Sequence, residues 1–403
     1  MNESKSNDQR RDAYDDAILD SNAIAPNDAQ GNPIPVTIPI DLAPGVKVVY
    51  TTRLGGVSEG DWADCNFGGK SGDNPVHVRA NREALAKAID APLSLVGQVH
   101  SGRAIDVDEC LRRNASYGSD LSGTVMDQTQ SEALQTPVVT EKVEETKEII
   151  SDEGVVVRED STVIKQVADD AGTDGGQLGT SEDLHDSVPA EPGHFPKLEA
   201  DGQVTTQTGM ALGMFAADCL PVLLADATAG VIGACHCGRR GLERGVIGST
   251  VELMLAKGAR PERIVATLGP CICGDCYEVG DEIADAFDAR FPGTFTLTRF
   301  GGPGIDIAKA ARQELEKAGI PRDNVIDSAP RVAAATQYLD HDAELADLCA
   351  NDGEGESDLA DRLAQLRHPM CTLENPLWYS HRRASLAKKE HEGRFLALIV
   401  RED

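Results

Sequence analysis

Two histidines and one cysteine lie where they could assemble a catalytic metal site. His100 ends the run LVGQVH, Cys219 ends FAADC and His236 ends VIGACH, so each follows a short apolar run that predicts a buried strand. Two imidazoles and one thiolate suit Zn²⁺, and three protein ligands leave a fourth position open for water or substrate. Spacing alone does not exclude that these histidines bind no metal, because a histidine after a strand is often an ordinary core or surface residue.

Four further polar residues have both a functional and a structural interpretation. Arg53, followed by Leu-Gly-Gly, could hold an anion or be a surface residue before a turn. Asn66, before two glycines, could bind a polar ligand edge or simply form a turn. Asp218 could orient a ligand or transfer a proton, or cap the segment that follows it. Arg240 could bind phosphate where a helix starts near Leu242.

A thiol-rich segment follows at residues 269–279. Cys271, Cys273 and Cys276 could form a second metal site, but the sequence shows no clear fourth ligand, so reduced thiols are the alternative. The chain has no Walker A loop, and its glycines match no dinucleotide-binding fingerprint.

Alternating strands and helices must position these residues. The apolar runs and helical periodicity favour α+β or mixed α/β packing over a doubly wound parallel sheet. Strands are expected at 46–52, 93–99, 211–216, 222–225, 231–235, 264–268 and 395–400. Helices are expected at 74–89, 245–258, 279–287 and 307–318.

Polar, acidic segments interrupt this pattern. Residues 1–34 predict a disordered acidic tail, which leaves 35–403 as the catalytic domain. Residues 111–198 contain 18 acidic and 7 basic residues and predict a largely disordered surface insertion, with one hairpin at 154–167. A second acidic insertion is expected at 340–361. For the 111–198 insertion, a solvent-exposed spacer is favoured over a segment that binds a partner.

Composition excludes some classes of partner. The chain has 403 residues, 40% of them hydrophobic, so it can form one large domain or two ordinary ones. Its net charge of −29 argues against nucleic acid and against an anionic membrane surface. The sequence has no long apolar run and no apolar segment typical of a secretory signal. We therefore expect a cytoplasmic monomer in which the ten cysteines are thiols or metal ligands.

Several short motifs, in order, resemble the laccase-domain family, whose members are also called polyphenol oxidases, purine nucleoside phosphorylases and peptidoglycan editing factors. The resemblance covers about Val46 to Val400, apart from the acidic insertions. The motifs are Gln98-Val-His100, Ala217-Asp-Cys-Leu-Pro221, His236-Cys-Gly-Arg-Arg-Gly241, Gly269-Pro with Cys276-Tyr-Glu-Val279, and Ser380-His-Arg-Arg383.

The resemblance implies a fold, a metal and a chemistry. The fold is a single layered αββα domain like the catalytic domain of cytotoxic necrotizing factor, and the metal is one zinc ion at His100, Cys219 and His236. The activities are phosphorolysis of adenosine, inosine and methylthioadenosine, and hydrolytic deamination of adenosine. We expect zinc-activated water to attack C6 of adenosine, with Asp218 transferring a proton. Arg53 and Arg240 would position phosphate against C1′, and Asn66 would contact the substrate.

Three alternatives remain. In the first, Cys219 is the nucleophile of an amidohydrolase that edits peptidoglycan precursors, with His236 or His100 as base. The second is a copper-dependent polyphenol oxidase, which a single His/Cys/His site disfavours because a laccase needs several copper centres. The third is a non-catalytic zinc-binding interaction protein.

The sequence also departs from the family pattern. Where the family usually has His-Ala-Gly-Trp-Arg-Gly, this chain has Cys237 for the Ala and Arg239 for the Trp. Residues 384–392 replace the family's terminal Arg-Asp-Gly turn, and the 271–276 segment is richer in cysteine than usual. These changes keep the proposed ligands and bear on substrate preference.

Overall fold

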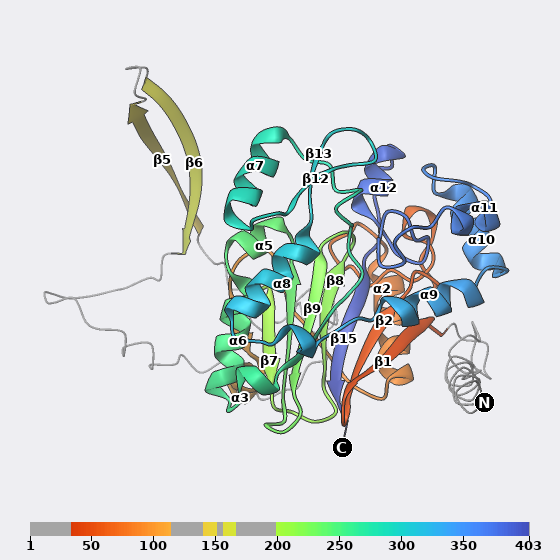
Figure 1. Ribbon diagram of the computed structural model, residues 1–403, viewed down its shortest axis with the longest axis horizontal. Helices are drawn as coiled ribbons and strands as arrows, with labels where there is room; N and C mark the ends of the chain where they lie inside the picture. The colour runs from red at the N-terminus through yellow and green to blue at the C-terminus, as the bar shows by residue number, and fades with distance from the viewer. Residues whose placement is uncertain (1–33, 114–139, 151–155, 167–198, 403) are drawn as a thin grey trace, which may run out of the picture. The chain divides into compact units, whose positions relative to one another are not determined.

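The computed structural model describes residues 34–113, 140–150, 156–166 and 199–402 (Figure 1). The chain forms two units. The larger comprises Met1–Val125 and Phe195–Asp403, and the smaller comprises Met126–His194. The larger unit contains the strands and helices that carry all the candidate site residues.

Two sheets form the centre of the larger unit. The first has the order β1 (Thr37–Ala43), β2 (Val46–Thr51), β15 (Phe395–Arg401), β8 (Ala211–Ala216) and β3 (Leu93–Leu95). The second has the order β14 (Val325–Ile326), β11 (Val265–Leu268), β9 (Leu220–Asp226), β10 (Val231–Cys237), β7 (Gly202–Thr205) and β4 (Ala104–Asp106). β12 (Phe295–Leu297) and β13 (Pro303–Ile305) form a separate antiparallel pair.

Helices and short turns surround the sheets in the described residues of the larger unit. The helices are α2 (Pro75–Ala88), α3 (Val107–Arg113), α5 (Arg239–Glu243), α6 (Val246–Ala256), α7 (Asp281–Arg290), α8 (Ile307–Lys317), α9 (Ala329–Tyr338), α10 (Ala343–Asn351), α11 (Leu359–Ala364) and α12 (His381–Leu386). 3-10 turns lie at Gly60–Trp62, Pro261–Arg263 and Arg322–Asn324.

Side-chain alternation along the strands produces helix–sheet–sheet–helix layers. On β15, Ala397 and Ile399 face the same core as Leu223 of β9, so the two sheets pack against each other. Their neighbours point outward: Leu398 packs in a core with Leu85 of α2. On the far side of the second sheet, odd-numbered residues of β10 pack in a core that contains buried residues of α6 and α8. The mixed α+β class expected from the sequence is confirmed.

The expected elements recur with shifted ends, and one shift affects the site. The strand expected at 93–99 ends at Leu95, and Gly97 makes only an isolated bridge to Glu199. His100 therefore lies in a loop beyond the strand, with a φ of 57°. A non-glycine residue in this left-handed region is uncommon and is found preferentially at functional sites.

The second acidic stretch differs from the expectation of a disordered insertion. Residues 340–361 contain α10 and the start of α11, and Leu345, Leu348 and Leu359 are buried in the main core. Leu345, Leu348 and Cys349 have the spacing of one helix face, which explains why this acidic segment folds.

The smaller unit also differs from expectation. The hairpin predicted within 154–167 is a single strand, β6 (Val156–Gln166), paired antiparallel with β5 (Thr140–Ile150). β6 contains no glycine or proline to form a turn, so it continues as one strand. The rest of the expected insertion, apart from residues 111–113, and the expected tail, apart from Ile34, lie outside the described residues. Among the described residues, no helix is long and apolar enough to cross a bilayer.

Candidate functional site

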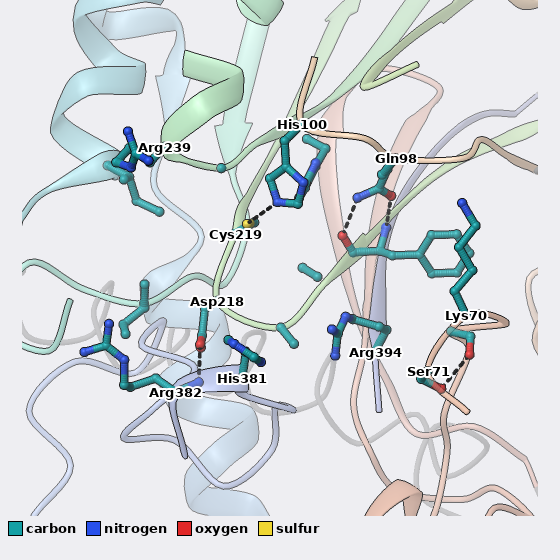
Figure 2. A pocket seen from close by; sticks show the side chains of 18 of the residues that line it. Lys70, Ser71, Gln98, His100, Asp218, Cys219, Arg239, His381, Arg382 and Arg394 are labelled. Carbon is teal, nitrogen blue, oxygen red and sulfur yellow. Dashed lines mark hydrogen bonds between the residues drawn. The ribbon is translucent and has the colours of Figure 1, made fainter. Parts of the chain in front are cut away.

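Three segments remote in the chain bring His100, Cys219 and His236 together. Figure 2 shows His100 and Cys219 of this group side by side. One ligand atom from each residue lies within 4.8 Å of those of the other two. His100 Nε2 is 3.6 Å from Cys219 Sγ, and the two imidazole rings meet edge to face with centroids 4.8 Å apart. All three residues line a cavity of about 470 Å³.

Strand pairing places Cys219 beside His236. β9 and β10 pair antiparallel, with Leu220 opposite Cys237, so Cys219 lies next to the chain that leaves β10. Gly238 lies at this point, and a Cβ there would be 2.8 Å from Cys219 Sγ and 3.0 Å from His100 Cδ2. The absence of a side chain at residue 238 therefore leaves room for the two other groups to approach.

Asp201, immediately before β7, organises two of the three candidate ligands. Its Oδ1 accepts a hydrogen bond from the His100 backbone N–H at 3.0 Å and lies 2.9 Å from His236 Nδ1. Its Oδ2 accepts a hydrogen bond from the Ser101 hydroxyl at 2.7 Å. Asp201 is fully buried, and it leaves His236 Nε2 as the ring nitrogen that can bind a metal. Sequence analysis missed this residue, because an aspartate before a strand carries no specific signal.

The electrostatics of the site favour charged forms of Cys219 and His236. Burial by itself raises the pKa of Cys219, but the nearby His236 cation and hydrogen bonds from both histidines lower it to about 6. Burial by itself lowers the pKa of His236, but the Cys219 thiolate and Asp201 raise it to about 9. Without a metal the two groups therefore form a thiolate–imidazolium pair near neutral pH.

The donor set fits a transition-metal ion. A thiolate and two imidazole nitrogens are ligands that zinc and copper accept, and Asp201 supplies the carboxylate that commonly orients a ligating histidine. The cavity beside the three ligand atoms leaves space for a further ligand. These residues could therefore hold a metal with an open coordination position.

The rest of the cavity combines apolar and cationic walls (Figure 2). Phe215, Ile272 and Tyr277 supply apolar surface. The cations are Lys70, Arg239, Arg382 and Arg394. In a chain of net charge −29, this local concentration of positive charge favours an anionic ligand.

Asp218 lies in the cavity wall beside Cys219, at a φ of 95°. Its Oδ1 accepts a hydrogen bond from the Thr372 hydroxyl at 2.7 Å, and its Oδ2 accepts one from the Arg382 backbone N–H at 2.6 Å. Asp218 therefore fixes the start of α12, and with it Arg382, against the loop that carries Cys219.

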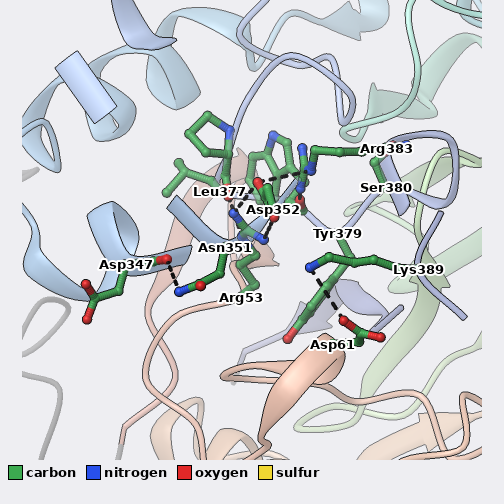
Figure 3. A network of polar contacts seen from close by, with 12 residues as sticks. Arg53, Asp61, Asp347, Asn351, Asp352, Leu377, Tyr379, Ser380, Arg383 and Lys389 are labelled. Carbon is green, nitrogen blue, oxygen red and sulfur yellow. Dashed lines mark hydrogen bonds and ion pairs between the residues drawn. The ribbon is translucent and has the colours of Figure 1, made fainter. Parts of the chain in front are cut away.

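Arg53 is not among the residues that line this cavity. It lies in a network of polar contacts with Asp352 (Figure 3). Its guanidinium is buried and donates to both carboxylate oxygens of Asp352, at 2.6 and 2.9 Å. Arg53 Nε donates to the Pro376 carbonyl at 2.6 Å. The expected role in binding substrate or phosphate is not supported, because these contacts hold the guanidinium inside the protein and away from the cavity.

Asn66 and Arg240 also lie outside the cavity wall. Asn66 is buried, and its side chain bonds to Ser71, Asp73 and the backbone N–H groups of Gly68 and Arg394. This is the structural alternative to ligand binding. Arg240 is exposed, whereas the neighbouring Arg239 lines the cavity. One of the four cavity cations, Arg239, therefore stands where the family pattern usually has Trp.

Known proteins are similar to this chain in sequence. A purine nucleoside phosphorylase from Streptomyces griseus is 31% identical over 271 residues, which cover 67% of this chain and 79% of the relative. A purine nucleoside phosphorylase from Deinococcus radiodurans is 48% identical over 122 residues, covering 30% of this chain and 48% of the relative. An adenosine deaminase from an unknown prokaryotic organism is 39% identical over 132 residues, covering 32% and 50% respectively.

Solved structures share the fold. A Neisseria meningitidis protein superposes with a TM-score of 0.54 at 23% identity, covering 91% of this chain and 99% of the other. The protein YfiH from Bacillus licheniformis gives a TM-score of 0.55 at 21% identity, covering 91% and 96%. The family model described as multi-copper polyphenol oxidoreductase laccase matches residues 47–140 and 139–341. The chain therefore belongs to the multi-copper polyphenol oxidoreductase laccase family.

Proposed function

We propose that this protein is a zinc-dependent purine nucleoside phosphorylase that also deaminates adenosine. The observation that carries the proposal is the placement of His100, Cys219 and His236 in the wall of the cavity whose cations favour phosphate. Relatives named purine nucleoside phosphorylase and adenosine deaminase support the same two reactions. A zinc ion at the three ligands would supply Lewis-acid polarisation of a substrate or water atom.

The cavity walls suggest how a nucleoside and phosphate would be held. Phe215 and Tyr277 offer aromatic surface for a purine, and Arg382 lies with its guanidinium carbon 5.7 Å from the Tyr277 ring centroid. Arg382 Nη2 donates to the Glu278 carbonyl at 2.7 Å, which holds the guanidinium beside the cavity. We infer that Arg382, positioned by Asp218, binds phosphate in place of Arg53 and Arg240.

Zinc is proposed over copper because of the ligand set. Three protein ligands with an open position are typical of catalytic zinc sites, and the expected phenol oxidation needs several copper centres. The other groups of possible ligands in the described residues share Cys273 and consist of thiols with nearby Glu374 and His368, so they do not supply a histidine-rich copper cluster.

A second candidate activity is hydrolysis of an amide by Cys219. The thiolate–imidazolium pair of Cys219 and His236 has the charge state of a cysteine nucleophile and its acid–base partner. In that mechanism Asp201 would orient the His236 ring.

One experiment tests both candidates. Purified protein is analysed for bound metals and assayed for inosine phosphorolysis and for ammonia release from adenosine. We expect bound zinc and both activities, and we expect Cys219→Ala to lose the metal of this site together with both activities. Cys235→Ala is the matched control, because this thiol lies on the same strand as His236 but its Sγ faces the Val222 carbonyl.

The outcomes separate the candidates. An unchanged metal content in Cys219→Ala would refute the ligand assignment. Metal-free protein that cleaves an amide, and loses this activity in Cys219→Ala, would favour the thiol hydrolase. Zinc binding without turnover of any nucleoside or amide would favour a non-catalytic protein.

A further inference from the structure

A second cluster of thiols lies outside the candidate active site. The sulfur atoms of Cys273, Cys276 and Cys371 all lie within 4.8 Å of one another. Cys273 and Cys276 belong to the segment after β11, whereas Cys371 comes from the loop before α12. Cys276 and Cys371 are buried and Cys273 is half-buried.

Glu374 lies beside these thiols and is the candidate for a fourth ligand, and its Oε1 also accepts a hydrogen bond from Arg367 Nη2 at 3.2 Å. Its Oε1 lies 3.4 Å from Cys276 Sγ. Its Oε2 accepts hydrogen bonds from the backbone N–H groups of Arg367 and His368, at 3.1 and 3.0 Å, which fix the carboxylate toward the thiols. The His368 ring is the other nearby donor, but it is exposed and its Nε2 lies 3.1 Å from Asp275.

The environment of Cys371 favours a thiolate ligand. The Cys273 backbone N–H donates to Cys371 Sγ at 3.4 Å. N–H···S bonds of this kind stabilise negative charge on sulfur.

The spacing suits a tetrahedral ion. Zinc with Zn–S bonds of about 2.3 Å holds its sulfur ligands about 3.8 Å apart, so the three sulfurs need only small shifts to bind one ion. A disulfide would use two of these three thiols and leave the third with no thiol to pair with in the cluster. All ten cysteines of the chain are free thiols in this structure.

We propose that Cys273, Cys276, Cys371 and Glu374 bind a structural zinc ion, separate from the candidate catalytic metal. With four protein ligands the site is closed, so it stabilises the fold and does no chemistry. The ion would join the 271–277 segment to the 367–376 loop.

Both joined segments hold the wall of the active-site cavity. The Ile272 backbone N–H donates to the Asp218 carbonyl at 3.0 Å, and the Thr372 hydroxyl donates to the Asp218 carboxylate. Because Asp218 precedes Cys219 and contacts the Arg382 backbone, the structural ion would stabilise the loop that carries an active-site ligand.

Native mass spectrometry of the whole chain, purified with reductant and zinc, tests the proposal. We expect two zinc ions on the wild-type chain, and one on Cys276→Ser/Cys371→Ser together with a lower melting temperature. Cys271→Ala is the matched control, because this buried thiol lies in the same segment but outside the cluster, and it should retain two ions. Glu374→Gln should bind the second ion at least tenfold more weakly, whereas His368→Gln should not.

The experiments can distinguish failure of the catalytic-metal proposal from failure of the structural-zinc proposal. Cys219→Ala should keep the structural ion and, loaded with cobalt(II), should show thiolate-to-cobalt charge-transfer absorption from the second site alone. The cobalt absorption of Cys219→Ala also tests the structural site if the Cys276→Ser/Cys371→Ser variant does not fold. Absence of that absorption, an equal zinc count in the folded double variant and the wild type, or a disulfide among these cysteines in the reduced protein would each overturn the proposal.

Discussion

His236 Nδ1 lies 2.9 Å from the Oδ1 atom of Asp201, and neither side chain is exposed by more than 3%. The same oxygen accepts the His100 backbone N–H, so one carboxylate holds two candidate ligands that are 136 positions apart in sequence. Burial by itself raises the pKa of Asp201, but the His236 and Ser101 hydrogen bonds lower it, so the group is a carboxylate at neutral pH.

Asp201→Asn should therefore weaken metal binding without removing a ligand. Loss of a carboxylate that orients a ligating histidine typically costs about 10–100-fold in metal affinity or activity. Competition with a chelator measures the affinity. The control is Asp226→Asn, which alters a buried carboxylate at the other end of β9, bound to Arg263, and should reduce stability while leaving metal affinity unchanged. Equal metal affinity in Asp201→Asn and the wild type would contradict the role of Asp201.

Alkylation of the metal-stripped protein should reveal the Cys219 thiolate. Because the pKa of Cys219 is lowered to about 6, its reaction with iodoacetamide should rise with pH to half its maximum near pH 6. Peptide mass spectrometry at each pH gives the profile. His236→Gln should move the midpoint upward, since the His236 cation is the main cause of the lowered pKa. A wild-type midpoint above pH 8 would contradict the thiolate–imidazolium pair.

Gly238→Ala should disrupt the metal site selectively. The added Cβ would lie 2.8 Å from Cys219 Sγ, so the sulfur or the loop must shift. We expect loss of the bound metal and at least tenfold lower activity, with a folded protein by circular dichroism. Gly248→Ala, in α6 with nothing within 4 Å of the added Cβ, should be neutral or stabilise by about 0.5–1 kcal/mol. A full metal complement in Gly238→Ala would show that the site tolerates the added methyl group.

Sequence pattern predicted the strands best where the apolar runs are continuous. β8, β10 and β15 lie close to the expected ranges, because strands buried on both faces carry apolar residues at successive positions. Candidate ligands next to these runs are also brought together, since β9 and β10 are neighbours in one sheet. The strand before His100 is shorter than expected, because an apolar run does not show where the backbone leaves the sheet.

Pairings between charged residues could not be predicted in this way. Arg53 before two glycines resembles an anion-binding turn, and only the fold shows that Asp352, 299 positions away, takes its guanidinium. The partner lies in the acidic stretch at 340–361, where many charged side chains obscure a buried helix face. Asp201 was missed for the same reason, because its role depends on two residues that the fold brings to it.

Arg53 and Arg382 should differ in what their loss affects. Arg53→Lys loses the two-pronged contact with buried Asp352, which Arg362 and Arg383 also approach, at a cost of roughly 2 kcal/mol in unfolding free energy. Its KM for phosphate should stay within twofold of wild type. Arg382→Gln should instead raise the KM for phosphate at least tenfold, with little change in melting temperature. A higher phosphate KM in folded Arg53→Lys would restore the expected role of Arg53.

Glu344→Gln should make stability less dependent on pH. Glu344 accepts the Gly55 backbone N–H at 2.7 Å, and burial together with the neighbouring Asp64 raises its pKa from 4.5 to about 8. The folded protein therefore keeps a proton that the unfolded chain releases, so this contribution is present below pH 4.5 and is lost as pH rises through about 8. Because the uncharged Gln side chain resembles protonated Glu at every pH, the variant should match wild type at pH 5 and be more stable at pH 8.5. We expect the free energy of unfolding at pH 8.5 to rise by an amount on the order of 1–2 kcal/mol, since solvent screens this partly exposed pair.

Urea unfolding at the two pH values measures the difference, with Glu356→Gln, at an exposed position, as the control. An equal loss of stability with pH in Glu344→Gln and wild type would mean that Glu344 does not keep its proton in the folded state.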